Sequence, residues 1–235
     1  MVNIEEIVND SENRLQIWSS FIKTNGFRNI VELGVYKGEF AENILLNCDV
    51  IEKYYMIDPW RKLAEWNKPA NTDNDIFEQF YIETMNKTEF ASNRRIILRG
   101  KTQEMHQEIA NDSLDFAYID GDHTLKGITV DLITIWDKIK PDGFIAGDDF
   151  CSSIWQHDKS FEPTLVFPFA VYFAEAKNVK IYALPFNQFL IAKGSREFEF
   201  IDITKGNYSD LSLLNQVKMQ NEVPKMSFFS RFLKK

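Results

Sequence analysis

The chain is poor in cysteine, in basic residues and in long apolar runs. It has two cysteines in 235 residues, Cys48 and Cys151, far apart and without metal-ligand spacing, which is typical of free thiols in a reducing compartment. No apolar run approaches the roughly 18 residues of a membrane-spanning helix. The net charge of −8 lacks the basic footprint of a nucleic-acid-binding protein. We therefore expect a cytoplasmic protein with no membrane span and no nucleic-acid partner.

Short apolar runs alternate with segments of helical character along most of the chain. This alternation is typical of a parallel sheet in which a helix follows each strand. Two further runs, 180–184 and 188–192, are separated by only three residues, which predicts an antiparallel hairpin. We predict a doubly wound, Rossmann-like α/β sheet, mostly parallel with an antiparallel C-terminal hairpin strand and with helices on both faces. The other expected strands are 29–33, 54–58, 95–98, 114–119 and 143–147, and the expected helices are 4–24, 39–47, 76–87, 103–110 and 125–139.

No domain boundary is visible in the composition, and the length suits one α/β domain. We expect a single domain over 1–235, with a helical extension at 1–26, a core at 27–194 and an appendage at 195–235.

Acidic side chains follow two of the predicted strands at the point where each strand ends. Asp120, Asp122 and His123 follow the strand 114–119, and Asp148 and Asp149 follow the strand 143–147. Open α/β sheets bind their ligands beyond the carboxyl ends of the strands. Because like charges repel unless a positive group lies between them, this crowding of acids indicates a divalent cation.

A glycine turn follows the first predicted strand, at the place where nucleotide-type ligands bind. Gly34 and Gly38 allow a sharp turn and a close approach of the backbone, but Tyr36 stands where dinucleotide enzymes carry a second glycine. Asp58, at the end of the second strand, could accept ribose hydroxyls, and Glu32 could face an ammonium group. The turn therefore favours a ligand with a ribose and a cationic group. The plainer interpretation of this segment is a tight turn without a ligand.

An ordered set of short motifs between residues 28 and 150 gives the chain a family resemblance. It resembles a class I S-adenosylmethionine-dependent methyltransferase, of the metal-dependent O-methyltransferase kind that includes catechol, caffeoyl-CoA and macrocin-type sugar enzymes. No single motif is decisive, but their order is specific. The motifs are E-L-G-x-x-x-G at 32–38, the acid at 58, G-K-T-Q at 100–103, I-D-G-D-H at 119–123 and K-P-D-G-F-I-A-G-D-D at 140–149.

The resemblance implies a role for each motif in binding S-adenosylmethionine. Residues of the first motif would line the methionine side, Asp58 would bind the ribose, and Thr102 with Gln103 would lie beside the adenine. The cofactor-binding residues implied in this way are Glu32, Gly34, Tyr36, Gly38, Asp58, Thr102, Gln103 and Asp120.

The resemblance also implies a metal site and a catalytic base. Asp120, Asp148 and Asp149 would be the metal ligands, and an all-oxygen set suits Mg²⁺, with Mn²⁺ or Ca²⁺ as alternatives. Catechol-type enzymes carry asparagine where this chain has Asp149. His123 would accept the proton of the acceptor hydroxyl; the plainer alternative is a hydrogen-bonding or helix-terminal histidine. We interpret Asp122 as the cap of the following helix.

These features predict a metal-dependent O-methyltransferase acting on a small polyhydroxylated acceptor, a sugar or glycan in preference to a catechol. The alternatives are a metal-independent N- or C-methyltransferase of the same fold and a non-catalytic S-adenosylmethionine-binding module. An aromatic-rich loop at 151–170, with Trp60 and Trp66 opposite, is expected to wall the acceptor site, although the same aromatics could be ordinary core. The sequence leaves open whether the chain forms a homodimer.

Overall fold

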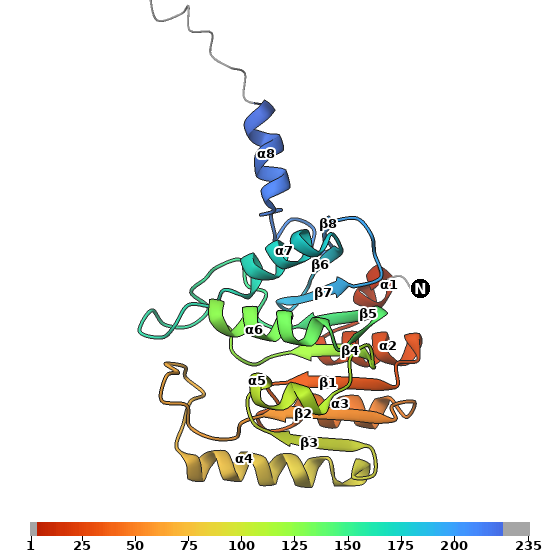
Figure 1. Ribbon diagram of the computed structural model, residues 1–235, viewed down its shortest axis with the longest axis vertical. Coiled ribbons are helices and arrows are strands. Elements are labelled where there is room, and N and C mark those ends of the chain that lie inside the picture. Colours follow the sequence, from red (N-terminus) through yellow and green to blue (C-terminus); the bar gives the residue numbers. More distant parts are fainter. Residues whose placement is uncertain (1–3, 223–235) are drawn as a thin grey trace, which may run out of the picture.

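The computed structural model describes residues 4–222, and an eight-stranded sheet runs through them (Figure 1). The strand order is β3-β2-β1-β4-β5-β7-β6-β8, and the first five strands of this order are parallel. The hairpin strand β7 is antiparallel to both β5 and β6, while β8 adds in parallel to β6. The strands are β1 (Asn29–Leu33), β2 (Lys53–Asp58), β3 (Arg95–Arg99), β4 (Leu114–Ile119), β5 (Ile139–Gly147), β6 (Lys180–Leu184), β7 (Gln188–Ala192) and β8 (Glu199–Asp202).

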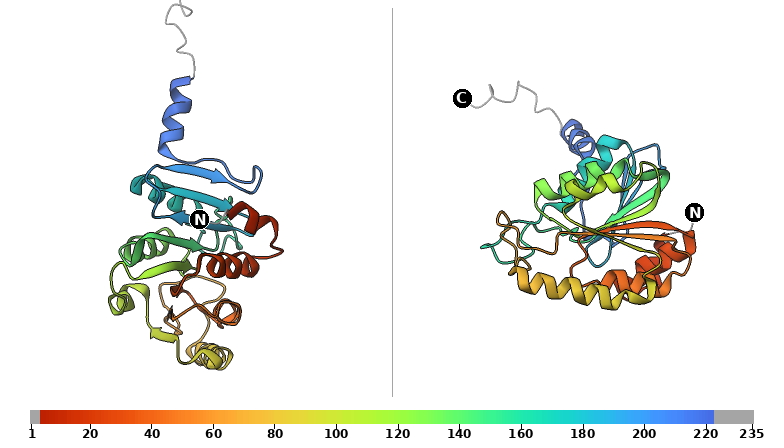
Figure 2. Two further views of the ribbon diagram at one scale, coloured as in Figure 1. Left: turned by 90° about the vertical axis from the view of Figure 1, so that its right-hand side faces the viewer. Right: turned by 60° about the horizontal axis from the view of Figure 1, so that its bottom comes forward.

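Helices cover both faces of the sheet, and each face has its own apolar core (Figure 2). Strand β4 shows the division, since Phe116 and Tyr118 belong to one core and Ala117 and Ile119 to the other. One face carries α1 (Ile4–Asn9), α2 (Arg14–Asn25), α3 (Glu39–Asn47) and α4 (Asn74–Lys87); the other carries α5 (Thr102–Met105), α6 (Leu125–Trp136) and α7 (Val166–Lys177). The predicted doubly wound α/β sheet with its antiparallel hairpin is confirmed.

The N-terminal extension differs from the single helix expected over 4–24. The first helix ends at Asn9 and a second begins at Arg14. Asn13 is the N-cap of the second helix, since its side chain accepts a hydrogen bond from the Gln16 N–H at 3.1 Å. Gly26 ends α2 with a left-handed φ of 67°, as the Asn-Gly pair predicted. The break makes Arg14 the first residue of α2.

Three further segments differ from the prediction. The chain from 166 onward is the helix α7, where a loop extending to 170 was expected. The helix α6 ends at Trp136 and β5 begins at Ile139, so the strand starts earlier than predicted. The segment expected as an appendage contributes β8 to the sheet and the helix α8 (Leu213–Glu222). Within residues 4–222 no helix combines the length and the apolar character needed to cross a membrane.

Candidate active site

A cavity of about 680 Å³ lies at the carboxyl ends of β1, β2 and β4. Its volume is in the range of small-molecule sites. The structure therefore brings most of the predicted cofactor residues to one place, whereas Gly38, Asp148 and Asp149 are outside its lining. The predicted residues that line it are Glu32, Gly34, Tyr36, Asp58, Thr102, Gln103, Asp120 and His123.

The turn after β1 is built from three left-handed residues at alternate positions. Gly34, Tyr36 and Gly38 have φ values of 84°, 53° and 74°. Tyr36 thus adopts the backbone conformation of the glycine that it replaces, at the cost of strain that L-residues usually avoid. Gly34 has no room for a side chain, since a Cβ would collide with the backbone carbonyl of Asp120. Gly38 precedes α3 and packs on Thr84, so it shapes the turn without lining the cavity.

Asp58 holds this turn in place. Its Oδ2 accepts the N–H groups of Val35 and Tyr36, both at 2.9 Å, and its Oδ1 accepts the N–H of Trp60 at 2.7 Å. Burial raises the pKa of Asp58, and the three backbone hydrogen bonds oppose that rise. Because a carboxylate has about four acceptor sites, about one remains for a ribose hydroxyl.

Glu32 is a buried carboxyl group on the wall of the cavity. It is 1% exposed, and the hydroxyl of Tyr54 donates a hydrogen bond to it at 2.8 Å. Burial raises its pKa well above the usual value, and the nearby charges of Asp120 and Asp58 raise it further. A positively charged ligand group next to Glu32 would stabilise the ionised form of its carboxyl group. The ammonium group of a methionine moiety fits this position.

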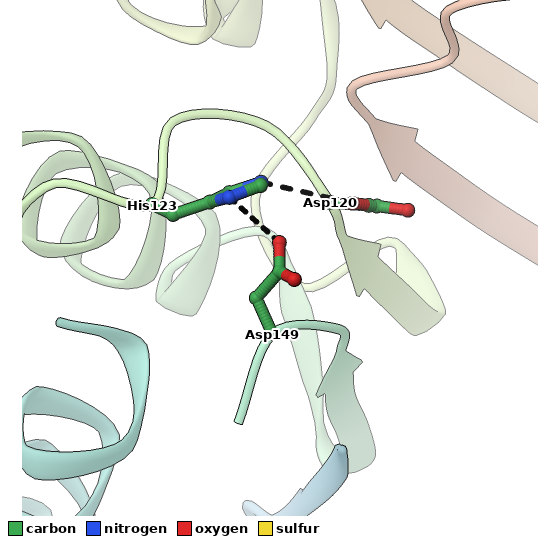
Figure 3. Close-up of side chains that lie close together, drawn as sticks. All are labelled: Asp120, His123 and Asp149. Atoms are coloured by element: carbon green, nitrogen blue, oxygen red, sulfur yellow. Dashed lines mark ion pairs between the residues drawn. The ribbon is translucent and has the colours of Figure 1, made fainter. Parts of the chain in front are cut away.

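Asp120, His123 and Asp149 lie together beyond the ends of β4 and β5 (Figure 3), and the first two line the cavity. One ligand atom from each lies within 4.8 Å of the others. The His123 Nε2 is 3.8 Å from Asp120 Oδ1, and its Nδ1 is 2.7 Å from Asp149 Oδ2. That second contact is an ion pair, and within the described residues the buried Nδ1 has no hydrogen-bond partner. Two carboxylates and an imidazole fit a divalent cation such as Mn²⁺ as well as Mg²⁺.

Asp149, which contacts His123, has an unusual backbone conformation. Its φ is 58°, an uncommon value for a residue other than glycine. The amide of Gln156 donates to Asp149 Oδ1, and Gln156 in turn accepts a hydrogen bond from Thr164 at 2.9 Å. The ion pair with His123 helps to lower the pKa of Asp149 against the effect of burial. The loop after β5 therefore fixes Asp149 toward His123.

Asp148 points to a different set of partners. Its Oδ2 makes an ion pair with Arg14 of α2, and its Oδ1 accepts a hydrogen bond from the Gln188 amide at 2.7 Å. Of the three acids predicted as metal ligands, Asp120 and Asp149 both contact His123, whereas Asp148 does not and pairs with Arg14, which also pairs with Asp120. Sequence analysis missed Arg14, because its position in the extension gave no sign that it reaches the ends of β4 and β5.

Asp122, expected to cap α6, is not the N-cap of that helix. Thr124 is the N-cap, since its hydroxyl accepts the Gly127 N–H at 3.1 Å. Asp122 accepts a hydrogen bond from the N–H of Thr124 at 3.0 Å and so stabilises the position of the N-cap residue.

The aromatic walls are only partly as expected. Trp66 lines the cavity. Trp60 is 1% exposed and packs edge-to-face on Tyr81, so it belongs to the core. Phe167 is likewise buried and packs against Phe150. The ordinary-core interpretation is correct for these two residues.

Two further cavity residues carry chemistry that the sequence did not reveal. Lys68, in the loop between β2 and α4, places its Nζ in a buried position with no hydrogen-bond partner within the described residues. Asp131 on α6 is 5% exposed, and burial raises its pKa to about 7, against the effect of a hydrogen bond with Thr102. Both residues are polar groups in sequence contexts without a recognisable motif.

The raised pKa of Asp131 predicts a pH dependence of folding stability. The folded chain holds a proton up to about pH 7 that the unfolded chain releases near its ordinary pKa of 3.8, so the free energy of unfolding falls as pH rises between these values. Asp131→Asn removes this effect. We expect the loss of stability between pH 5 and pH 8, measured by urea unfolding, to be about 2–3 kcal/mol smaller in the variant. Parallel pH profiles for the two proteins would contradict the assignment.

The parallel sheet, the glycine turn at its switch point and the acid-lined cavity define a class I S-adenosylmethionine-dependent methyltransferase. Residues 31–150 match the family model described as a methyltransferase domain, and the chain belongs to this family. A comparison with curated protein sequences finds no match.

Solved structures show the same fold at low sequence identity. An O-methyltransferase from Bacillus cereus in complex with SAH has a TM-score of 0.56 at 15% identity. The matched region covers 80% of this chain and 89% of the Bacillus cereus chain. A putative caffeoyl-CoA O-methyltransferase from Staphylococcus aureus has a TM-score of 0.57 at 15% identity, with coverage of 82% and 93%. An SAH-bound methyltransferase from Podospora anserina has a TM-score of 0.54 at 15% identity, with coverage of 78% and 80%.

Proposed function

We propose that this methyltransferase acts on a hydroxyl group of a small polyhydroxylated acceptor, a sugar or glycan, with the help of a divalent cation. The observation that supports this proposal is the Asp120–His123–Asp149 group at the rim of the cofactor cavity. A carboxylate pair and an imidazole beside a methyl donor suit the activation of a weakly acidic hydroxyl. A non-catalytic binding module would have no use for them.

The chain's own residues would position S-adenosylmethionine along the cavity. Glu32 faces the ammonium group, the turn at Gly34 and Tyr36 passes close to the methionine part, and Asp58 offers its remaining acceptor site to the ribose. Thr102 and Gln103 then flank the adenine. The cofactor would supply an activated methyl group, and fixed positions for donor and acceptor in one cavity would favour its transfer.

Asp120, Asp149 and, once it is free of Arg14, Asp148 would hold the cation, as Mg²⁺ or Mn²⁺. A bound divalent cation lowers the pKa of a hydroxyl group next to it. His123 accepts the hydroxyl proton at Nε2, the ring nitrogen that faces Asp120, while Asp149 stabilises the resulting imidazolium from the Nδ1 side.

The polar lining beside this group favours a sugar over a flat aromatic acceptor. Lys68, Asp122, His157 and Glu162 all line the cavity. Their donors and acceptors match hydroxyl groups that point in several directions, whereas a catechol presents two hydroxyls and an apolar ring.

The test is methyl transfer to a panel of sugars, glycans and catechols, measured as formation of S-adenosylhomocysteine with added Mg²⁺ or with EDTA. We expect product with a polyhydroxylated acceptor, lost in EDTA and restored by metal. Turnover that is indifferent to the chelator, with an amine or carbon acceptor, would favour the N- or C-methyltransferase alternative. Binding of S-adenosylmethionine without turnover on any acceptor would favour the non-catalytic module.

A further inference from the structure

Arg14 brings a positive charge from the N-terminal extension into the acid cluster. Its Nη1 is 3.2 Å from Asp120 Oδ2 and 3.2 Å from the hydroxyl oxygen of Tyr118, and it makes an ion pair with Asp148 Oδ2. The guanidinium therefore bridges the acids at the ends of β4 and β5. It is the only ion-pair partner of Asp148 within residues 4–222.

The helix that carries Arg14 gives no local reason for a cation at this position. Arg14 is the first residue of α2, and the first turn of α2 contains no acidic residue. A positive charge at a helix N-terminus is unfavourable, because the helix dipole is positive there. The two carboxylates of the site, and not the helix, therefore account for the favourable interactions of Arg14.

A buried hydrogen-bond network fixes the partner of Arg14. The amide oxygen of Gln188 accepts hydrogen bonds from the Trp18 indole at 2.7 Å and the Tyr118 hydroxyl at 2.9 Å. The amide nitrogen of Gln188 donates to Asp148 at 2.7 Å. Trp18 lies one turn along α2 from Arg14. The helix α2 is therefore linked to Asp148 in two ways, directly by the Arg14 guanidinium and indirectly by Trp18, which donates to the same Gln188 that donates to Asp148.

We propose that Arg14 is a built-in cation that competes with the divalent cation for Asp120 and Asp148. With Arg14 in place, its guanidinium occupies Asp120 Oδ2 and Asp148 Oδ2, two of the oxygens that a metal ion would need. A metal ion bound by Asp120, Asp148 and Asp149 requires Arg14 to release both carboxylates. This inference rests on the metal site of the proposed function and adds that the start of α2 regulates its loading.

Competition of this kind is reciprocal, because a ligand that displaces a contact is itself opposed by that contact. Metal binding should therefore loosen the start of α2, and removal of the Arg14 charge should tighten metal binding. Arg14→Gln removes the charge, while Arg14→Lys keeps it. Arg28→Gln is the matched control, since Arg28 is 64% exposed in its side chain and pairs with Glu52 away from the site.

The experiment is Mn²⁺ binding to the full chain, measured by electron paramagnetic resonance without S-adenosylmethionine. We expect Arg14→Gln to bind Mn²⁺ about tenfold more tightly than wild type, and Arg14→Lys and Arg28→Gln to remain near wild type. In wild type, saturating Mn²⁺ should increase amide hydrogen exchange over residues 11–18. Circular dichroism and thermal unfolding check that each variant folds.

The outcomes separate this inference from the proposed function. Equal Mn²⁺ affinity in wild type and Arg14→Gln would overturn the competition and leave the metal site standing. Weaker binding by a folded Arg14→Gln would also overturn it, because Arg14 would then support the site. If none of the proteins binds Mn²⁺ and methyl transfer proceeds in EDTA, both the metal site and the competition are wrong.

Discussion

Replacement of His123 by glutamine is expected to lower kcat by about 10²–10⁴-fold, the usual contribution of a positioned general base. The affinity for S-adenosylmethionine, measured by calorimetry, should change little, because the ring faces Asp120 and Asp149 at the rim of the cavity. His106→Gln is the control. His106 lies outside the cavity lining, and its Nδ1 is 3.1 Å from the Thr102 carbonyl oxygen.

The pH profile of the wild type gives the same assignment an independent test. Burial opposes the charged imidazolium of His123, but the carboxylates of Asp149 and Asp120 outweigh it and raise the pKa above the ordinary 6.5. A base must be unprotonated, so kcat/KM should rise with pH and reach half of its plateau above pH 6.5. This rising limb should disappear in the His123→Gln variant.

Three results would contradict the assignment of His123 as the general base. Full activity of His123→Gln with loss of activity in His157→Gln would move the base to His157, which also lines the cavity. A large fall in Mn²⁺ affinity of His123→Gln would make His123 a metal ligand. A pH profile that is the same in wild type and variant would exclude it as the titrating group.

The fold, and the residues that come together at the carboxyl ends of the strands, could be predicted because both depend on local patterns. A strand that ends in a glycine turn, or in carboxylates, can be read from a few neighbouring residues, and the parallel order of strands then brings these ends to one edge of the sheet. Glu32, Gly34 and Asp120 line the cavity for this reason.

The acid cluster after β4 and β5 was less predictable because its side-chain directions depend on distant residues. Asp148 and Asp149 are neighbours in the sequence, yet one turns to Arg14 and the other to His123. Arg14 is 106 residues away from Asp120 along the chain, and no local signal links the two. The buried state of Trp60 is similar, since its edge-to-face contact with Tyr81 of α4 depends on tertiary packing.

Replacement of Gly34 by alanine is expected to destabilise the fold and to remove cofactor binding. The turn leaves no space, because the Gly34 N–H is bonded to the Ile57 carbonyl at 2.9 Å and the Asp120 N–H to the Leu33 carbonyl at 2.7 Å. A methyl group at Gly34 would meet the Asp120 backbone between these two bonds, where rotation of a side chain gives no relief. The strands would have to separate at the floor of the cavity.

Gly26→Ala is the matched control for this effect. Gly26 has a similar left-handed φ of 67°, but a Cβ there would find nothing within 4 Å. Its replacement should therefore show the conformational cost alone, about 1–2 kcal/mol of unfolding free energy, whereas Gly34→Ala should lose about 3 kcal/mol or more. Urea unfolding measures both losses, and calorimetry measures the affinity for S-adenosylmethionine, which we expect to fall at least about 100-fold in Gly34→Ala alone. Equal losses of stability and unchanged affinity in both variants would mean that the close approach of Gly34 to Asp120 contributes nothing to the cofactor site.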